Sequence, residues 1–222
     1  MFAGHYAAAF AAKAAEPKAP LWTLVAGCQL IDIGWSVFIA TGIEHASSDP
    51  SLPGSTLVLS DMPWTHSLPA VIVWSIVAGF AASVALRVSA RAAVMIGAVL
   101  FSHWLLDLIV PRPDLELFPN GPKVGLALWN YPVPEQAVEM GLLAVTGIFW
   151  AASRKALGQN AWPAAMFMTF LVVLQIVVMF MGPEPGPLGA QMGFSALAAY
   201  LLVVMLSLLV DGKPASLPQA SS

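Results

Sequence analysis

Histidine and aspartate residues occur at a spacing that suits a divalent metal ion. His103 and Asp107 are four residues apart within an apolar stretch. On a helix both side chains project from one face, about 6 Å apart. Imidazole and carboxylate groups are usual ligands of zinc, iron and manganese. The pair predicts one edge of a metal site, and it also fits a plain side-chain hydrogen bond.

A second acidic residue, Asp32, lies in the middle of another apolar stretch. An ionisable group at the centre of a bilayer costs roughly 2.5–3.5 kcal/mol on insertion scales, so it needs a partner. Neither Lys nor Arg lies at a comparable depth in these stretches. A cation would offset the charge of both Asp32 and Asp107. Asp32 could equally be a structural hydrogen-bond partner or one step of a proton path.

The composition predicts the elements that must position these residues. Hydrophobic residues make up 59% of the 222 positions and charged residues only 9%, whereas soluble proteins have about 25% charged residues. Crossing a bilayer requires about 20 apolar residues, and lipid-exposed backbone must form helices. We therefore predict an all-α integral membrane protein, with one domain over residues 1–210 and about six spans. The spans are expected near residues 21–42, 67–86, 92–110, 131–152, 162–182 and 188–210.

The two ends of the chain differ from these spans. Residues 1–15 are rich in alanine, but no basic region precedes them as it would in a secretory signal. They predict a short helix that packs against the bundle or dips into it. Residues 211–222 are rich in Pro, Ser and Ala and predict a disordered tail. No basic or aromatic surface pattern indicates nucleic acid as a partner; the expected partner is the lipid bilayer.

The distribution of basic residues predicts the orientation of the spans. Lys and Arg are enriched in short cytoplasmic loops, and here they concentrate in alternate connections. The opposite connections carry mainly acidic residues. A single alternating orientation with a cytoplasmic C-terminus satisfies all six spans. The basic residues that define it are Lys13, Lys18, Arg87, Arg91, Arg154, Lys155 and Lys213.

This topology brings the polar residues of several spans to one level near the outer face. Asp107 lies near the outer end of its span, and His103 lies one turn deeper. His66 begins the preceding span at the same side. Asp32 lies about ten residues, or roughly 15 Å, below the outer end of its own helix and forms the floor. His5 joins them if the N-terminal helix begins on the outer side, as the lysines at its other end indicate.

Two further acidic residues are candidates for catalysis. Glu139 lies one turn deeper than Glu135, which we expect to cap its helix. We predict Glu139 to be an additional ligand or the base that orients the attacking water, and Asp61 to be a weaker candidate at the mouth of the site. Zinc is the expected metal because three imidazoles with carboxylates suit it, although manganese and iron share these ligand types. The predicted metal ligands are His5, Asp32, His66, His103 and Asp107.

Four short motifs in the first half of the chain resemble a known family. They are Gly4-His5 opening a helix that ends in Ala12-Lys13, Leu30-Ile31-Asp32-Ile33, Trp64-Thr65-His66-Ser67-Leu68 and Ser102-His103-Trp104-Leu105-Leu106-Asp107. In order and spacing they resemble the YdjM-like family of bacterial membrane-bound, predicted metal-dependent hydrolases. The resemblance implies a hydrolase in the bacterial inner membrane. The orientation predicted from the basic residues then places its site toward the periplasmic face. The chain departs from the family pattern at Asp61, Gly34 and Trp35, where the family usually has further histidine, arginine or acidic residues.

The order of the ligands also looks like that of zinc-dependent phospholipase C enzymes. This analogy implies hydrolysis of a phosphoester, and a site embedded in a membrane favours a lipid or lipid-linked substrate. Two other functions remain open at this point. The same carboxylates and imidazoles could form the path of a proton- or ion-coupled transporter, or the chain could be a membrane scaffold without activity. No pattern in the sequence indicates an oligomeric state.

Overall fold

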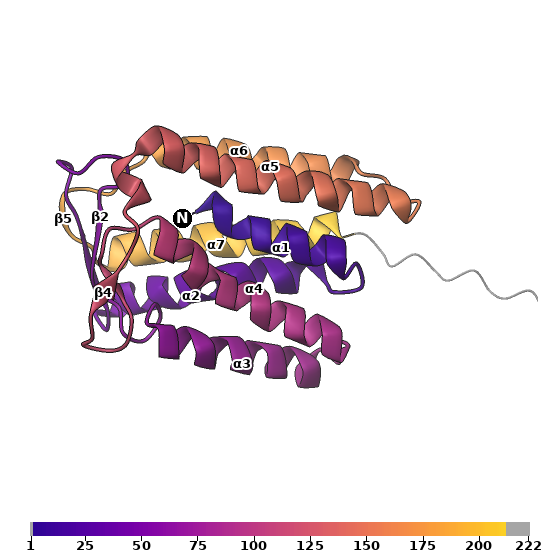
Figure 1. The fold of residues 1–222 in the computed structure, drawn as a ribbon, viewed down its shortest axis with the longest axis horizontal. Helices are drawn as coiled ribbons and strands as arrows, with labels where there is room; N and C mark the ends of the chain where they lie inside the picture. The colour runs from indigo at the N-terminus through magenta and orange to yellow at the C-terminus, as the bar shows by residue number, and fades with distance from the viewer. Residues whose placement is uncertain (1, 212–222) are drawn as a thin grey trace, which may run out of the picture.

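Residues 2–211, which the computed structural model describes, fold into a bundle of seven α-helices with a few short strands (Figure 1). Six of the helices, α2 to α7, are long and apolar enough to cross a bilayer. The predicted fold class is therefore confirmed. The helices are α1 (Ala3–Ala15), α2 (Leu21–Thr41), α3 (Leu68–Ala85), α4 (Ala90–Ile109), α5 (Pro132–Ala156), α6 (Trp162–Phe180) and α7 (Ala190–Val210).

The ends of the long helices carry recognisable start and stop signals. The hydroxyl of Ser89 accepts a hydrogen bond from the backbone N–H of Ala92 and so caps α4. Gly42 follows α2 in the left-handed conformation, with φ of 73°, which glycine adopts without steric cost. The largest difference from the predicted spans is that α5 continues to Ala156, past the predicted end at residue 152.

Small residues allow neighbouring helices to approach closely. A Cβ atom added at Gly97 on α4 would lie 2.9 Å from the backbone oxygen of Ser75, and one added at Gly79 on α3 would lie 2.9 Å from that of Ala93. Gly193 has the same role where α7 crosses α2. In a bilayer, where hydrophobic exclusion does not drive association between helices, such close packing holds them together. The pair α3 and α4 is fixed in this way.

The short helix α1 lies inside the bundle, between α5 and the pair α2 and α4 (Figure 1). Tyr6 and Phe10 are fully buried, and Phe10 packs on Trp150 of α5. Its 13 residues rise about 20 Å, less than the roughly 30 Å of a hydrocarbon core. The expectation of a short helix packed in the bundle is therefore confirmed, and α1 begins on the side of the strands.

The connections at this end are more ordered than the sequence indicated. We expected polar loops, but β1 (His45–Ser48) pairs with β2 (Leu57–Asp61) and with β5 (Gly186–Pro187), while β3 (Leu115–Glu116) pairs with β4 (Lys123–Val124). The strands are too short to give a clear alternating pattern. Backbone carbonyls in these loops also accept hydrogen bonds from Lys123 and Arg112. These segments cover one end of the helix bundle.

Ion pairs fasten the opposite end. The ammonium group of Lys13, at the end of α1, lies 2.6 Å from a carboxylate oxygen of Asp211. Asp211 also accepts a hydrogen bond from the backbone N–H of Leu21, and Arg91 pairs with Glu16 at 2.9 Å. Asp211 therefore belongs to the folded bundle, contrary to the prediction that the disordered tail begins there. Residues 212–222 lie outside the described part of the chain.

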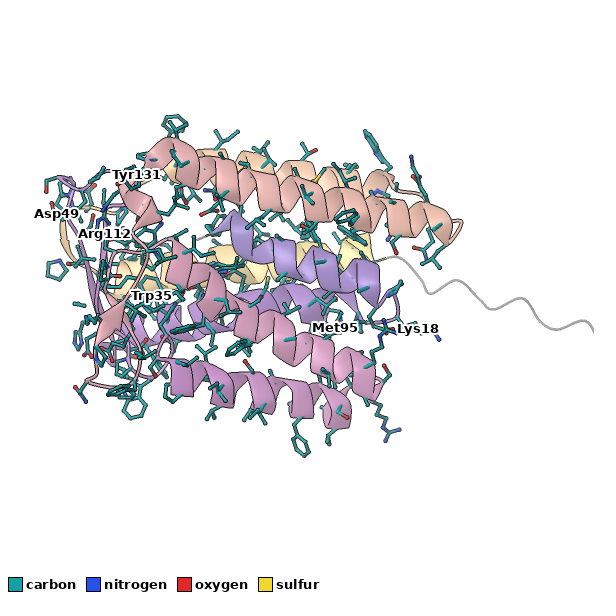
Figure 2. All side chains as sticks on the ribbon, in the orientation of Figure 1. Lys18, Trp35, Asp49, Met95, Arg112 and Tyr131 are labelled. Carbon is teal, nitrogen blue, oxygen red and sulfur yellow. The ribbon has the colours of Figure 1, made fainter. Side chains whose placement is uncertain are left out.

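The first testable prediction concerns the side of the membrane. Figure 2 shows Asp49 and Arg112 at the strand end and Lys18 at the opposite end. Because basic residues favour the cytoplasm, a membrane-impermeant maleimide should label Ser51→Cys in intact cells and spare Ala156→Cys until the cells are permeabilised. Cys28 is buried and gives no background. The reverse pattern would place the strand end in the cytoplasm.

Candidate metal centre

Three imidazoles and two carboxylates meet inside the bundle, near the strand end. His5 comes from the first turn of α1, Asp32 from α2, and His103 with Asp107 from α4, while His66 lies just before α3. His5 and His103 are 1% exposed, His66 4% and Asp107 6%. Among the residues that the structure describes, these five make two overlapping groups whose ligand atoms lie within 4.8 Å of one another. The five predicted metal ligands are thus neighbours in space.

Asp107 contacts all three imidazole rings. One carboxylate oxygen, Oδ1, lies 3.2 Å from Nε2 of His5. The other, Oδ2, lies 3.2 Å from Nε2 of His103 and 3.7 Å from Nε2 of His66. Despite this proximity, Nε2 of His5 and Nε2 of His103 form no hydrogen bond with the described residues. Close contact without hydrogen-bond alignment is the arrangement of ligands that surround a common ion.

Asp32 completes the cluster from the other side. Its Oδ1 lies 3.4 Å from Nε2 of His66 and 3.5 Å from Nε2 of His103. Two ligands at about 2.0–2.1 Å from a tetrahedral zinc ion lie about 3.3 Å from each other. The separations around Asp32 and Asp107 are close to this value. The cluster therefore has the dimensions of a metal site.

The hydrogen bond of His103 fixes which ring nitrogen carries its proton. Nδ1 of His103 lies 2.7 Å from the backbone oxygen of Cys28. A carbonyl oxygen can only accept a hydrogen bond, so Nδ1 must donate. In the neutral ring, Nε2 then presents a lone pair, and it points at the carboxylates of Asp32 and Asp107. The backbone of α2 thus fixes the tautomer of His103 in which Nε2 is free to bind a metal ion.

A relay of three residues does the same for His66. The hydroxyl of Thr65 donates to a carboxylate oxygen of Glu44 at 2.6 Å, and it lies 2.8 Å from Nδ1 of His66. A hydroxyl has one proton, so toward His66 it must accept, and Nδ1 of His66 must donate. Glu44 is itself held by the backbone N–H groups of Trp64 and Thr65. Such outer partners orient metal-binding histidines and raise their basicity.

These hydrogen bonds leave Nε2 of His66 and Nε2 of His103 without a proton when the two rings are neutral. The Nε2 lone pairs of His66 and His103 then face the carboxylates of Asp32 and Asp107, and buried lone pairs repel one another unless a cation lies between them. Within residues 2–211, no Lys or Arg forms an ion pair with Asp32. A divalent cation at the centre of the cluster would balance its negative charge. The donor set therefore fits a divalent metal.

Glu139 has a different place from the predicted ligand or base. Its Oε2 accepts a hydrogen bond from the backbone N–H of Gly4 at 3.0 Å, and both of its oxygens lie within 3.2 Å of the backbone N–H of Phe2. No side chain of α1 caps that helix from within. A carboxylate at this position satisfies free N–H groups and complements the helix dipole. Glu139 thus holds the end of α1 that carries His5.

Two glutamines complete the attachment of α1, and sequence reasoning missed both. The side-chain oxygen of Gln175 on α6 accepts from the backbone N–H of Ala3 at 3.2 Å. The side-chain amide of Gln29 on α2 donates to the backbone oxygen of Phe2 at 3.3 Å. Both glutamines are buried, and their polar groups in the middle of apolar spans were the available signal.

Asp61, the other predicted catalytic residue, lies apart from the cluster. It ends β2, and its carboxylate lies 3.3 Å from Nδ1 of His45 on β1. The side chains of His45 and Asp61 are 63% and 51% exposed, and Asp61 belongs to neither of the buried groups of possible ligands. The structure therefore does not bring Asp61 together with the metal ligands.

Comparisons with known proteins add no relative. No family model, no curated protein and no solved structure matches the chain. The function must therefore be inferred from the cluster itself.

The relay to His66 generates the second testable prediction. Thr65→Val removes the hydroxyl that accepts from His66 and takes one of three donors from Glu44, which keeps the backbone N–H groups of Trp64 and Thr65. Loss of such an outer partner typically lowers metal affinity about 10- to 100-fold, which a competition titration with zinc would measure. Thr146→Val is the matched control, because that hydroxyl bonds only carbonyls of its own helix. Equal zinc affinity in the Thr65 variant and wild type would contradict the relay.

The attachment of α1 generates the third prediction. Glu139→Gln removes the charge that faces the amides of Phe2 and Gly4, so the free energy of unfolding should fall by about 1–2 kcal/mol. Denaturant titration in detergent would measure it, with the exposed Glu184→Gln as control. Zinc affinity should also fall, because His5 is less firmly placed. Loss of activity with unchanged stability and zinc affinity would instead support the catalytic role predicted from the sequence.

Proposed function

We propose that the protein is a membrane-embedded, metal-dependent hydrolase that acts on a phosphoester of a lipid or lipid-linked substrate at the outer face. The observation that carries this proposal is the convergence of three imidazole Nε2 atoms on the carboxylates of Asp32 and Asp107, at 3.2–3.7 Å. The resemblance of the four motifs to the YdjM-like hydrolases agrees with it. So does the analogy with the ligand order of zinc-dependent phospholipases.

Five side chains would hold the metal: His5, Asp32, His66, His103 and Asp107. Zinc suits this set best, because three imidazoles and carboxylates are typical of its sites, and manganese or iron would use the same ligand types. A divalent ion in such a site supplies Lewis acidity toward a phosphoryl oxygen and makes water more acidic.

The protein contributes orientation and controlled access. His66 and His103 are held in one tautomer by Thr65 and by the backbone of α2. Asp32 is the most accessible of the five, with 14% of its side chain exposed against 9% for Asp107. Substrate would therefore approach from the side of Asp32. Burial of the others excludes bulk water, which strengthens electrostatic interactions within the site.

A proton- or ion-coupled transporter is the alternative that uses the same residues. In that case His103 would carry two protons and pair with the aspartates as an imidazolium. The ion pair of Lys13 with Asp211 lies at the other end of the bundle. Buried apolar residues such as Phe10 of α1 and Leu24 of α2 form the hydrophobic core. This arrangement favours a closed site over a continuous path.

The fourth prediction is that protein purified without chelators contains a divalent metal in at least a one-to-one ratio, measured by elemental analysis. His103→Ala and Asp107→Ala should each lose most of it. His103 belongs to both groups of possible ligands, and Asp107 contacts all three imidazole rings. His45→Ala should stay near wild type, because His45 is exposed and pairs with Asp61. Absence of metal, or equal loss in the His45 and His103 variants, would favour the proton path.

The same proteins test the hydrolysis. Wild type and His45→Ala should cleave bis-(4-nitrophenyl) phosphate, a soluble phosphodiester that releases a coloured product. Turnover should be lost in His103→Ala and after chelation, and it should return when zinc is added to chelated wild type. Stoichiometric metal without any turnover would leave the metal site standing and overturn the proposed hydrolase.

A further inference from the structure

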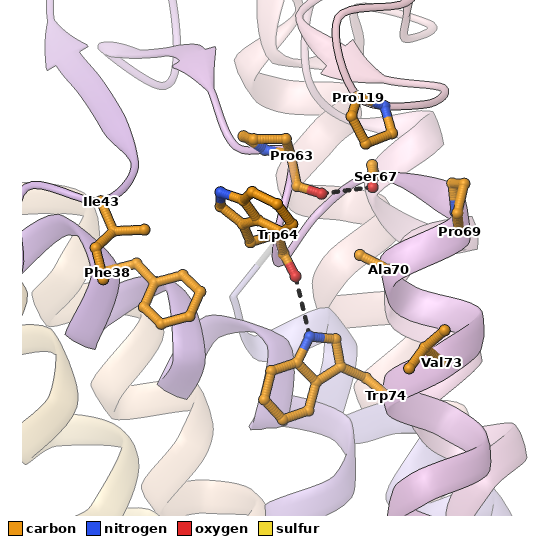
Figure 3. Close-up of a pocket in the computed structure, with 10 residues that line it drawn as sticks. All are labelled: Phe38, Ile43, Pro63, Trp64, Ser67, Pro69, Ala70, Val73, Trp74 and Pro119. Atoms are coloured by element: carbon orange, nitrogen blue, oxygen red, sulfur yellow. Dashed lines mark hydrogen bonds between the residues drawn. The ribbon is translucent and has the colours of Figure 1, made fainter.

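An apolar groove of about 620 Å³ lies between the end of α2 and the start of α3 (Figure 3). Phe38 and Ile43 form one side, and Val73 and Trp74 form the other. The polar groups at its edge are already satisfied: the indole N–H of Trp74 donates to the backbone oxygen of Trp64 at 3.0 Å, and the hydroxyl of Ser67 donates to that of Pro63. Apart from the indole N–H of Trp64, which has no hydrogen-bond partner among the described residues, the groove therefore offers mainly carbon surface to an occupant.

The groove is continuous with the surface that faces the bilayer. Trp64 and Val73, which line it, are each 60% exposed. Further along α3, the helix that carries Val73, Ile76 is 67% exposed and Phe80 is 70% exposed. A surface this apolar is stable against hydrocarbon and unfavourable against water. Because α3 is one of the helices long enough to cross the membrane, the groove opens sideways into lipid.

The groove also lies beside the candidate metal centre. Ser67, one of its lining residues, directly follows His66 in the chain. On the other wall, Phe38 comes six residues after Asp32 on α2, a rise of about 9 Å. Asp32 is also the most accessible of the five ligands. A molecule seated in the groove would lie against the segment that carries His66, about 9 Å along α2 from the level of Asp32.

A second, smaller apolar groove lies on the same seam between α2 and α3. It has a volume of about 260 Å³ and is lined by Gly27 and Leu30 of α2 and by Ala78 and Ala82 of α3. Since α3 packs tightly on α4 through Gly79 and Gly97, its side toward α2 is left less filled. The seam therefore has apolar hollows at two levels, which suits a long, flexible chain better than a compact molecule.

We propose that the larger groove binds an acyl chain of a membrane phospholipid and presents its phosphoester to the metal centre. This inference rests on the proposed function for the chemical step, and it names the substrate class as a glycerophospholipid taken laterally from the bilayer. Hydrolysis consumes one water: its hydroxyl joins phosphorus, the phosphorus–oxygen ester bond breaks, and the remaining proton goes to the departing alcohol oxygen. No other reactant is required.

Photo-crosslinking tests the occupant. Purified protein is placed in vesicles of dioleoyl phosphatidylcholine that contain a phosphatidylglycerol with a diazirine near the end of one acyl chain. After irradiation, mass spectrometry should locate most crosslinks at the ends of the groove, around Phe38 and residues 64–74. Ala70→Trp fills the groove and should reduce this labelling at least fivefold. Ile76→Trp, on the same helix and outside the groove, should not reduce it.

Several results would overturn the inference. One is labelling spread evenly over the exposed apolar residues of α3, α6 and α7, and another is labelling that Ala70→Trp leaves unchanged. Metal content of Ala70→Trp confirms that the variant folds. Turnover of the soluble diester by wild type tests the hydrolase separately, because that probe has no acyl chain.

Discussion

The burial of two carboxylates among three imidazoles is the constraint on which the rest of this structure depends. Asp32 carries negative charge at a depth where no Lys or Arg of the described chain pairs with it, and Asp107 lies beside the same imidazoles. Hydrogen bonds from Nδ1 of His66 and His103 direct the Nε2 lone pairs of both rings toward the same point. With both rings neutral and no cation between them, this arrangement of lone pairs and buried charge would be destabilising. With a divalent cation, each group gains an attractive partner.

The surrounding bundle serves to maintain this arrangement. The helix α1 is too short to cross a bilayer, and it is held at both ends. At its start, the carboxylate of Glu139 accepts a hydrogen bond from a backbone N–H of α1. At its last turn, Lys13 pairs with Asp211. His5 is thereby stacked on His103 with ring centroids 3.7 Å apart. The segment before α3 adds His66, fixed through Thr65 and Glu44. Four separate parts of the sequence thus contribute to one site, and each has its own attachment.

Much of the fold and the cluster could be predicted from the sequence, because lipid restricts what a span can contain. Hydropathy located the six long helices, and Asp32, His103 and Asp107 stood out as costly polar residues within them. Basic residues at the end of α1 indicated that His5 begins on the side of His66. The role of Glu139 in binding the first backbone N–H groups of α1 could not be predicted. These groups are more than 130 residues away in the chain, and the sequence around Glu139 gives no sign of them. Glu44 was missed because its partners, Trp64 and Thr65, lie 20 and 21 residues further along the chain. Asp61 lies apart from the cluster, and a polar loop carries acidic residues for solvation as well as for catalysis.

The central claim is that the three imidazoles and two aspartates bind one or more divalent metal ions. X-ray absorption spectroscopy of zinc-loaded protein tests it most directly. The account predicts nitrogen and oxygen ligands at about 2.0–2.1 Å, with the outer-shell scattering of imidazole rings, and loss of most of that imidazole signal in His103→Ala. A shell of oxygen ligands without imidazole scattering, or a spectrum that His103→Ala leaves unchanged, would contradict it.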